Sequence, residues 1–367
     1  MPQYDPLAQK RIQRMLRALI DVTEIPSNLI WLARTSVVPA TDQEIMARIT
    51  ERSIIADVIA DDQRAVVRND HSISLETVKI PNIKRGTEIT QEMLNTIERI
   101  LAGRPAPGDD DIFENYLQKR LEKILLGVRM QMNLMCVGRV LDSYSWSGLG
   151  VQISVNFGMP ADLKAIAGVN WATPATATPI ADIEALAAVA NDKYGKQYDR
   201  VTMPKADFNA MVRTEEFRNL ASGLRYFNFG EGQFPVQNSA MMKAVAGQLL
   251  DGRIIEFDDS QYGREANNGD HSFTRFLPTH KVVLSNSADD NTGAAADFAN
   301  GIVTETRVGS MSINGAPKLF EGPQYGPVGF ATLPNPDLNP PNANLWGVAR
   351  GFPRKHDLAE TAVLTVG

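Results

Sequence analysis

The residue types that most often carry chemistry are few in this sequence and lie far apart. Its four histidines are His71, His271, His280 and His356. None belongs to an HExxH pattern, which would place two zinc ligands on one face of a helix. A zinc site would have only one thiolate, that of Cys136, to draw on. We therefore interpret each histidine as a structural or surface residue and expect no metal site.

Cys136 lies in the apolar stretch from Met130 to Val140. A catalytic thiol needs a neighbouring base, and no histidine lies close to Cys136 in the sequence. We interpret this residue as a small buried hydrophobic side chain. A chain with one cysteine can form no internal disulfide, which is typical of a protein that folds in a reducing cytoplasm.

Other segments resemble parts of chemical motifs but lack the residues that the chemistry requires. Residues 289–293 lack the alternating aspartates and final glutamate of a calcium loop. Residues 322–326 lack the Lys-Ser/Thr pair of a phosphate loop, and residues 148–150 lack the third glycine of a dinucleotide loop. Ser147 lacks the preceding glycine of a nucleophile elbow. The sequence therefore argues against an enzyme, and we expect no catalytic residue and no cofactor.

Composition narrows the function classes further. The 367 residues are 43% hydrophobic and 22% charged, with a net charge of −6. This length suggests two or three domains. The acidic balance argues against a dedicated nucleic-acid binder, whose footprint is a basic patch. Residues 165–181 carry no charge, but their Asn, Thr and Pro content excludes a membrane span. We expect a soluble protein without a membrane partner.

One long amphipathic helix is the strongest structural signal. Apolar residues recur at steps of three and four, and no proline interrupts residues 112–141. These apolar residues are Phe113, Leu117, Leu121, Ile124, Val128, Met132 and Met135. At the usual rise of an α-helix, such a segment would be roughly 45 Å long, which is long for a globular domain.

The residues before this helix mix helix and strand signals. Capping residues predict helices that begin near residues 5, 39 and 90. The second, over residues 39–51, depends on a capping box of Thr41 and Glu44. Alternation then predicts strands over residues 64–68 and 72–80. A two-stranded ribbon is marginal in water, so we expect this excursion to lie on its own body or on a neighbour.

The residues after the helix predict a small α/β sheet and a Pro-rich return in strands. Residues 151–157 alternate as a strand, and residues 258–270 and 285–297 indicate surface loops. The expected helices begin at residues 179, 204, 214 and 238. The expected strands are residues 198–203, 253–257, 282–284, 301–305, 329–332, 346–351 and 361–366.

Several of these segments occur in an order that resembles a known family. They are Val155 to Gly158, Trp171, Pro179 to Ile183, Asp199 to Met203, and Thr361 to Val366. From about Ile54 to its end, the chain resembles the major capsid proteins of tailed phages, specifically the group like the lambda major head protein. The resemblance implies an α+β chain with the HK97-type capsid fold.

The resemblance also implies a division of the chain. An N-terminal arm over residues 1–53 would precede an extended β loop region over residues 54–110. The peripheral domain would comprise residues 111–160 and 310–367, with a spine helix over residues 112–141. An α/β axial domain would comprise residues 161–309.

The function that this implies is structural. The chain would assemble with itself into pentamers and hexamers that form an icosahedral head shell around double-stranded DNA, without reading its sequence. Portal, scaffold and decoration proteins would be partners. The protein would be made in the host cytoplasm and end in the virion.

We expect Ile80, Ile83, Lys84 and Arg85 to contact a neighbouring subunit, because the excursion has no obvious partner within the chain and shells require contacts between different patches. Three alternatives stay open: a nanocompartment shell protein of the same fold, a soluble enzyme with residues 179–304 as its catalytic domain, and a tail or baseplate component.

Overall fold

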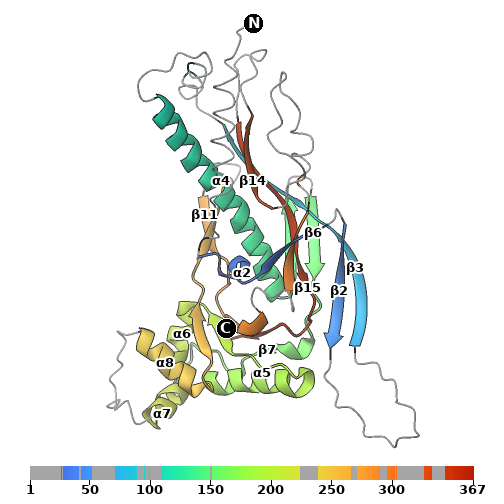
Figure 1. The fold of residues 1–367 in the computed structure, drawn as a ribbon. Coiled ribbons are helices and arrows are strands. Elements are labelled where there is room, and N and C mark those ends of the chain that lie inside the picture. Colours follow the sequence, from blue (N-terminus) through green and yellow to red (C-terminus); the bar gives the residue numbers. More distant parts are fainter. Residues whose placement is uncertain are drawn as a thin grey trace, which may run out of the picture.

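The computed structural model describes residues 26–40, 43–51, 71–88, 95, 99, 109–148, 151–223, 239–265, 271–289, 296–303, 326–332 and 344–367, except residues 27 and 302. A long helix, α4, leads into an α/β unit at one end of the molecule (Figure 1). The helix expected near residue 5 and the strand expected over residues 64–68 lie outside the described residues, as does most of the helix expected from residue 90.

Helix α4 runs from Asp109 to Val140 and confirms the long helix predicted from the apolar spacing. Its first three residues are aspartates, which suit the positive end of the helix dipole, and Arg139 lies in its last turn. Only one side of the middle of the helix is buried, whereas every residue from 135 to 140 is buried. The helix therefore passes from the surface into the core of the molecule.

The first sheet lies against this helix. Its strand order is β1 (Ser36–Pro39), β13 (Ala296–Asn300), β15 (Asn344–Lys355) and β14 (Val328–Thr332), and β4 (Asn82–Glu88) also pairs with β15. Strand β1 runs parallel to β13, and the other pairs are antiparallel. Strand β15 is the longest and contacts α4, β4, β13 and β14. This sheet thus gathers segments that lie far apart in the sequence.

The second sheet forms the centre of the α/β unit. Its order is β7 (Lys164–Ile166), β16 (Thr361–Thr365), β12 (Lys281–Ser285), β8 (Arg200–Met203) and β9 (Ile254–Phe257). Side chains in its middle strands are fully buried, including Val201, Val283 and Leu364. The helices of this unit are α5 (Pro179–Tyr194), α6 (Lys205–Val212), α7 (Glu215–Gly223) and α8 (Ser239–Leu249).

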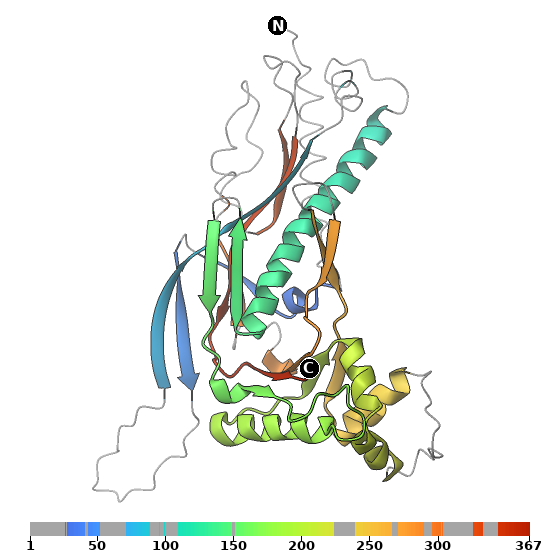
Figure 2. The ribbon, with the colours of Figure 1, turned by 180° about the vertical axis from the view of Figure 1, so that it is seen from behind.

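Three two-stranded sheets complete the described part of the fold. They are β2 (Gln43–Glu51) with β3 (His71–Lys79), β5 (Ser143–Gly148) with β6 (Val151–Asn156), and β10 (Gln261–Glu265) with β11 (His271–Arg275). The β2–β3 ribbon extends along the outside of the molecule toward the α/β end (Figure 1). Seen from behind, the green β5–β6 hairpin lies beside α4 (Figure 2). The Phe157 ring, just after β6, stacks on Phe352 of β15 with centroids 5.9 Å apart.

Two predictions from local signals were wrong. Residues 39–51 form the end of β1 and all of β2 rather than a helix, because pairing of β2 with β3 overrides the capping box of Thr41 and Glu44. Strand β3 confirms the strand predicted over residues 72–80, but its partner is β2. Residues 258–270 were expected to be a loop, and they contain β10, one strand of a hairpin.

Most of the remaining elements were predicted correctly. Helix α5 begins at Pro179 and ends at Gly195, whose φ of 64° is the left-handed conformation that glycine favours. Strands β6, β8, β9, β12, β14, β15 and β16 and helices α6, α7 and α8 each overlap an expected element. Strands β1, β5, β7 and β11 were not predicted. Of residues 301–305, expected to be a strand, only Gly301 and Val303 are described, and neither lies in a strand; β13 ends directly before them.

The division into axial and peripheral domains stays a prediction, and the two sheets cross its boundaries. Strand β16 lies in the second sheet with β8 and β12, although residues 310–367 were assigned to the peripheral domain. Strand β13 lies in the first sheet with β15, although residues 161–309 were assigned to the axial domain. The chain therefore passes from the second sheet to the first after β12, and it returns to the second sheet after β15.

A buried ion group joins β13 to β15. Asp297 is 5% exposed, and it accepts two hydrogen bonds of 2.6 Å from Arg354, the residue directly opposite on β15. His356 Nε2 lies 3.0 Å from the same carboxylate. Burial by itself would raise the pKa of Asp297, but hydrogen bonds from His356 and Arg354 outweigh it, and the pKa is lowered. The folded chain therefore stabilises the charged carboxylate.

We predict that Gly347→Ala destabilises the subunit. A Cβ atom at Gly347 of β15 would lie 2.6 Å from Ile124 Cγ2 of α4, so strand and helix would have to separate. Such overpacking costs about 1–3 kcal/mol. The matched control is Gly168→Ala, where nothing lies within 4 Å of the added atom. Urea unfolding of unassembled subunits measures both, and equal midpoints for the two variants would contradict the close packing of β15 on α4.

Asp297→Asn should lower the free energy of unfolding by about 2 kcal/mol at neutral pH, because Arg354 loses a charged acceptor. The lowered pKa means that the native carboxylate contributes stability above its ordinary pKa of about 3.9 and loses it as the pH falls through the lower folded value. The difference between variant and native chain should be constant from pH 7 to about pH 5 and shrink below about pH 4. Urea unfolding over this range measures it, and a difference that persists at the acid end would refute the assignment.

Candidate functional site

The four predicted contact residues fall into two classes. Ile80 and Ile83 are 2% and 7% exposed and belong to the chain's own hydrophobic core. Lys84 and Arg85 are exposed on β4. The stated ground for the prediction, the absence of a partner within the chain, was wrong for this segment, because β4 pairs along its whole length with β15. That partner lies about 260 residues further along the sequence, so no local signal indicates it.

Lys84 and Arg85 lie on opposite faces of the first sheet, because neighbouring side chains of a strand alternate. The Arg85 side chain lies directly over Gly127 of α4, where an added Cβ would overlap its guanidinium. Arg85 is thus on the helix side, with its stem against α4. Lys84 is on the other side and lies opposite Val348 of β15. The pair therefore presents positive charge on both faces of one strand.

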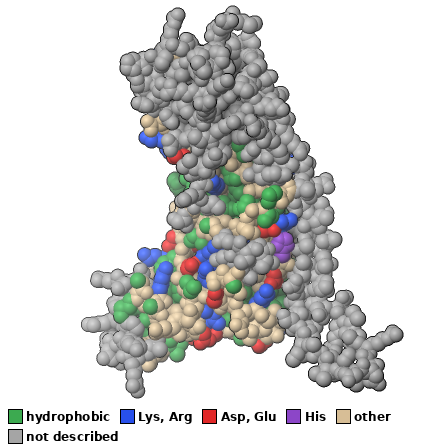
Figure 3. Space-filling model, in the orientation of Figure 1, with side chains coloured by type: hydrophobic (Ala, Val, Ile, Leu, Met, Phe, Trp, Pro, Cys, Tyr) green, Lys and Arg blue, Asp and Glu red, His purple; other side chains and the backbone are tan. Residues whose placement is uncertain are grey.

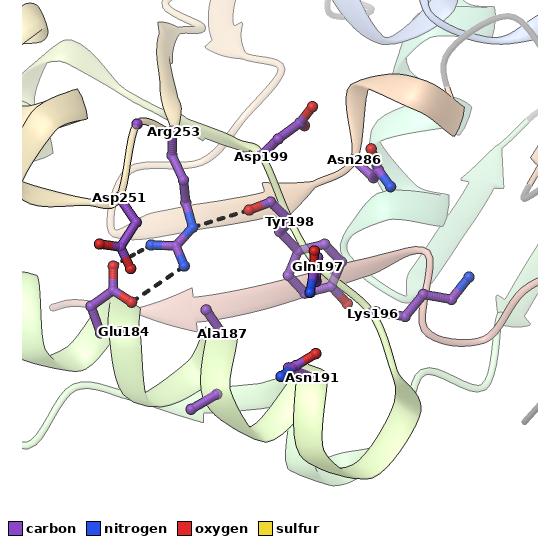
Figure 4. A pocket seen from close by; sticks show the side chains of 12 residues that line it. Glu184, Ala187, Asn191, Lys196, Gln197, Tyr198, Asp199, Asp251, Arg253 and Asn286 are labelled. Atoms are coloured by element: carbon purple, nitrogen blue, oxygen red, sulfur yellow. Dashed lines mark hydrogen bonds and ion pairs between the residues drawn. The ribbon is translucent and has the colours of Figure 1, made fainter. Parts of the chain in front are cut away.

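A hollow with a volume of about 640 Å³ lies in the α/β unit. Its walls come from α5, the segment before β8, the turn before β9 and the segment after β12 (Figure 4). Arg253 crosses it: the guanidinium pairs with Glu184, with Nη2 3.2 Å from Oε2, and Nε donates to the Tyr198 carbonyl over 3.0 Å. Asp199 accepts a 2.7 Å hydrogen bond from the backbone N–H of Ser287.

These hydrogen bonds and this ion pair limit the chemistry that the lining side chains can perform. Its lining residues include no serine, cysteine or histidine among those that the structure describes. Glu184 and Asp199 are held in an ion pair and in hydrogen bonds, so they are not placed as a proton donor and acceptor for a bound substrate. The arrangement places amide groups from Asn191, Gln197 and Asn286 beside Ala187 of α5 (Figure 4).

Two of the four histidines, His280 and His356, are engaged with buried carboxylates of the fold. His280 donates its backbone N–H to Asp207 over 2.8 Å, and its Nδ1 lies 3.3 Å from the same carboxylate. Burial raises the pKa of Asp207. His356 belongs to the Asp297 group, and His271 is exposed on β11. The described residues contain no group of three or more metal-ligating side chains that could hold a metal ion.

Cys136 is fully buried in α4, and burial raises the pKa of its thiol to about 11. The Thr35 hydroxyl lies 3.9 Å from the sulfur. At neutral pH the thiolate, which is the nucleophilic form, is therefore scarce. The predicted role of Cys136 as a buried hydrophobic residue agrees with this position.

On the face that Figure 3 shows, basic and acidic side chains are interspersed over the described part of the α/β unit, so this part of the surface carries no single dominant charge. Apolar side chains lie among them, and the most exposed large ones are Ile166 at 78% and Phe273 at 72%. Among the described helices, none has the length and apolar character that a bilayer span requires.

Comparison with known proteins identifies the family. The family model of phage major capsid protein E matches residues 33–298. A protein assigned as the capsid protein of a prophage in Escherichia coli CFT073 has a similar structure, with a TM-score of 0.56 and 14% identity over 97% of this chain and 99% of that chain. A phage-related protein from Bordetella bronchiseptica RB50 gives a TM-score of 0.50 and 12% identity over 100% and 98%. No curated protein matches the sequence.

The structural matches show the fold, and the family model shows the family. The family model covers α4, β1, β4 and most of the α/β unit, whereas the structural match covers nearly the whole chain. The fold is the mixed α and β fold of HK97-like phage capsid proteins, as the sequence resemblance implied. The role of such a protein is structural: it forms the shell of the phage head. The chain belongs to the phage major capsid protein E family.

Proposed function

We propose that this major capsid protein assembles with itself into pentamers and hexamers that close into an icosahedral shell around double-stranded DNA. The observation that carries the proposal is the β2–β3 ribbon, whose strands pair from Gln43–Lys79 to Glu51–His71. A two-stranded ribbon is marginal in water without further cover. It extends along the outside of the molecule, where a neighbouring subunit can cover it (Figure 2).

The foot of the ribbon is the proposed contact region. Ile80 and Pro81 join β3 directly to β4, so the position of β4 on β15 fixes where the ribbon leaves the body. We propose that Lys84 and Arg85 contact the next subunit. Ile80 and Ile83 would act indirectly, because their burial in the chain's own core holds β4 in place.

A head shell also needs proteins that this chain does not supply. We propose a portal for DNA entry, a scaffold that sets shell size, and possible decoration proteins as partners. Synthesis in the host cytoplasm would precede incorporation into the virion. The net charge of −6 supports enclosure of DNA rather than a tight grip on it, because tight binding would require a basic surface.

The direct test is electron microscopy with size-exclusion chromatography of the purified chain, expressed alone and with the scaffold of its phage. Closed shells or capsomers the size of pentamers and hexamers would support the proposal. Shells that enclose a host protein instead of being filled with DNA during infection would favour a nanocompartment. A monomer in both preparations that turns over a small molecule would overturn the structural role.

We predict that Lys84→Glu and Arg85→Glu each reduce shell yield at least several-fold, because charge reversal places like charges at an interface. The matched controls Lys84→Arg and Arg85→Lys keep the charge and should retain assembly. Yield is measured by sedimentation and microscopy, and urea unfolding of the unassembled variants separates lost contacts from lost stability. Full assembly of both charge-reversed variants would remove these residues from the interface.

A further inference from the structure

A small cavity lies where the two sheets meet at the end of α4. Its volume is about 20 Å³. Helix α4 contributes Arg139 and Val140, β12 ends beside it at Ser285, and β13 begins beside it at Ala296. The remaining lining residues are Trp31, Arg34, Asn286, Glu360 and Thr361. The cavity is therefore bordered by α4 and by elements of both sheets.

Three of the lining side chains carry buried polar atoms without a hydrogen-bond partner among the described residues. These atoms are Arg139 Nε and Nη1, Ser285 Oγ and Glu360 Oε2. The other ends of two of these groups are anchored, because Arg139 Nη2 lies 3.0 Å from Glu360 Oε1. Arg139 and Glu360 thus form an ion pair that leaves two donor nitrogens and one acceptor oxygen beside the cavity.

Three other polar side chains of the lining have partners within the described residues. Trp31 Nε1 donates to Asp258 over 2.7 Å, and Thr361 Oγ1 donates to the Val140 carbonyl over 3.1 Å. Arg34 forms an ion pair with Glu256. The unsatisfied atoms are therefore concentrated on the three residues Arg139, Ser285 and Glu360.

The hydrogen-bonding character of these atoms determines which kind of molecule can occupy the cavity. A buried donor or acceptor that stays unpaired costs about 1–3 kcal/mol, so a group that satisfies several of them at once is strongly favoured. The occupant must accept from Arg139 and donate to Glu360 Oε2. Water does both. Chloride cannot donate, and a metal cation would be repelled by the guanidinium.

Size and charge agree with this selection. A cavity needs roughly 10–15 Å³ to hold one water molecule, and a sulfate or phosphate would not fit in 20 Å³. The Arg139–Glu360 pair beside the cavity is neutral overall.

We propose that one structural water molecule occupies this cavity, accepts a hydrogen bond from Arg139, donates one to Glu360 Oε2 and bonds with Ser285 Oγ. The water joins the last turn of α4 to the end of β12 and to the residue before β16. It is a fixed part of the joint between the helix and the second sheet.

The first test is a structure of assembled shells at about 2 Å resolution, at which buried water is visible elsewhere in the molecule. A peak within hydrogen-bonding distance, about 2.7–3.2 Å, of the Arg139, Ser285 and Glu360 atoms is expected. Absence of that peak would overturn the proposal. A crystal of the subunit grown with bromide in place of chloride tests whether an anion occupies the cavity. Strong anomalous density there would show a bound anion and overturn the proposal.

The second test displaces the water. Ser285→Val removes one partner and fills the space, so we expect the midpoint of thermal unfolding to fall by about 3 °C or more, with no water peak in the variant. Ser285→Ala keeps the space, and its midpoint of thermal unfolding should fall less. The matched surface control is Ser145→Val on β5, where the side chain is exposed and no change is expected. A Ser285→Val chain as stable as the native one would show that no bound water was lost.

Discussion

The fold depends on one constraint, which is that the backbone of β15 must be hydrogen-bonded on both edges while the strand lies on α4. Strands β4 and β14 pair with the same residues of β15, so they occupy opposite edges, and β13 pairs with its second half. A buried backbone group without a partner is costly, so β15 can be buried only when segments from three distant parts of the chain have arrived. Gly347 allows the close approach to Ile124 that this layering needs.

The charged groups of the interior serve this arrangement rather than a reaction. Asp297 ties β13 to β15, Asp207 ties α6 to the turn before β12, and Arg139 ties the end of α4 to Glu360. Each carboxylate has its partners within the subunit. In the hollow beside α5, Glu184 and Asp199 are likewise engaged within the subunit.

The sequence predicted the elements whose signals are local and missed those that depend on distant pairing. The apolar spacing that predicts α4 and the Pro and Gly residues that bound α5 are local features of those segments. Strand β2 carries a local helix signal at Thr41 and Glu44, yet its pairing with β3 decides its structure. The proposed contact site shows the same limit. Ile80 and Ile83 looked unpartnered because β15 follows more than 250 residues later, whereas the absence of a catalytic motif needed no knowledge of the fold.

The path of the chain through β3, β4, β15 and β16 has a mechanical consequence. The ribbon continues through Ile80 and Pro81 into β4, whose partner β15 continues after Lys355 into the second sheet. Asn82 at the start of β4 pairs with Arg350, next to the end from which β15 continues toward the second sheet. The ribbon and the exit of β15 are therefore at the same end of the strand pair, so a pull that separates them would open the hydrogen bonds between β4 and β15 one after another from that end. The pair Asn82–Arg350 is thus the first to be loaded when the ribbon is displaced.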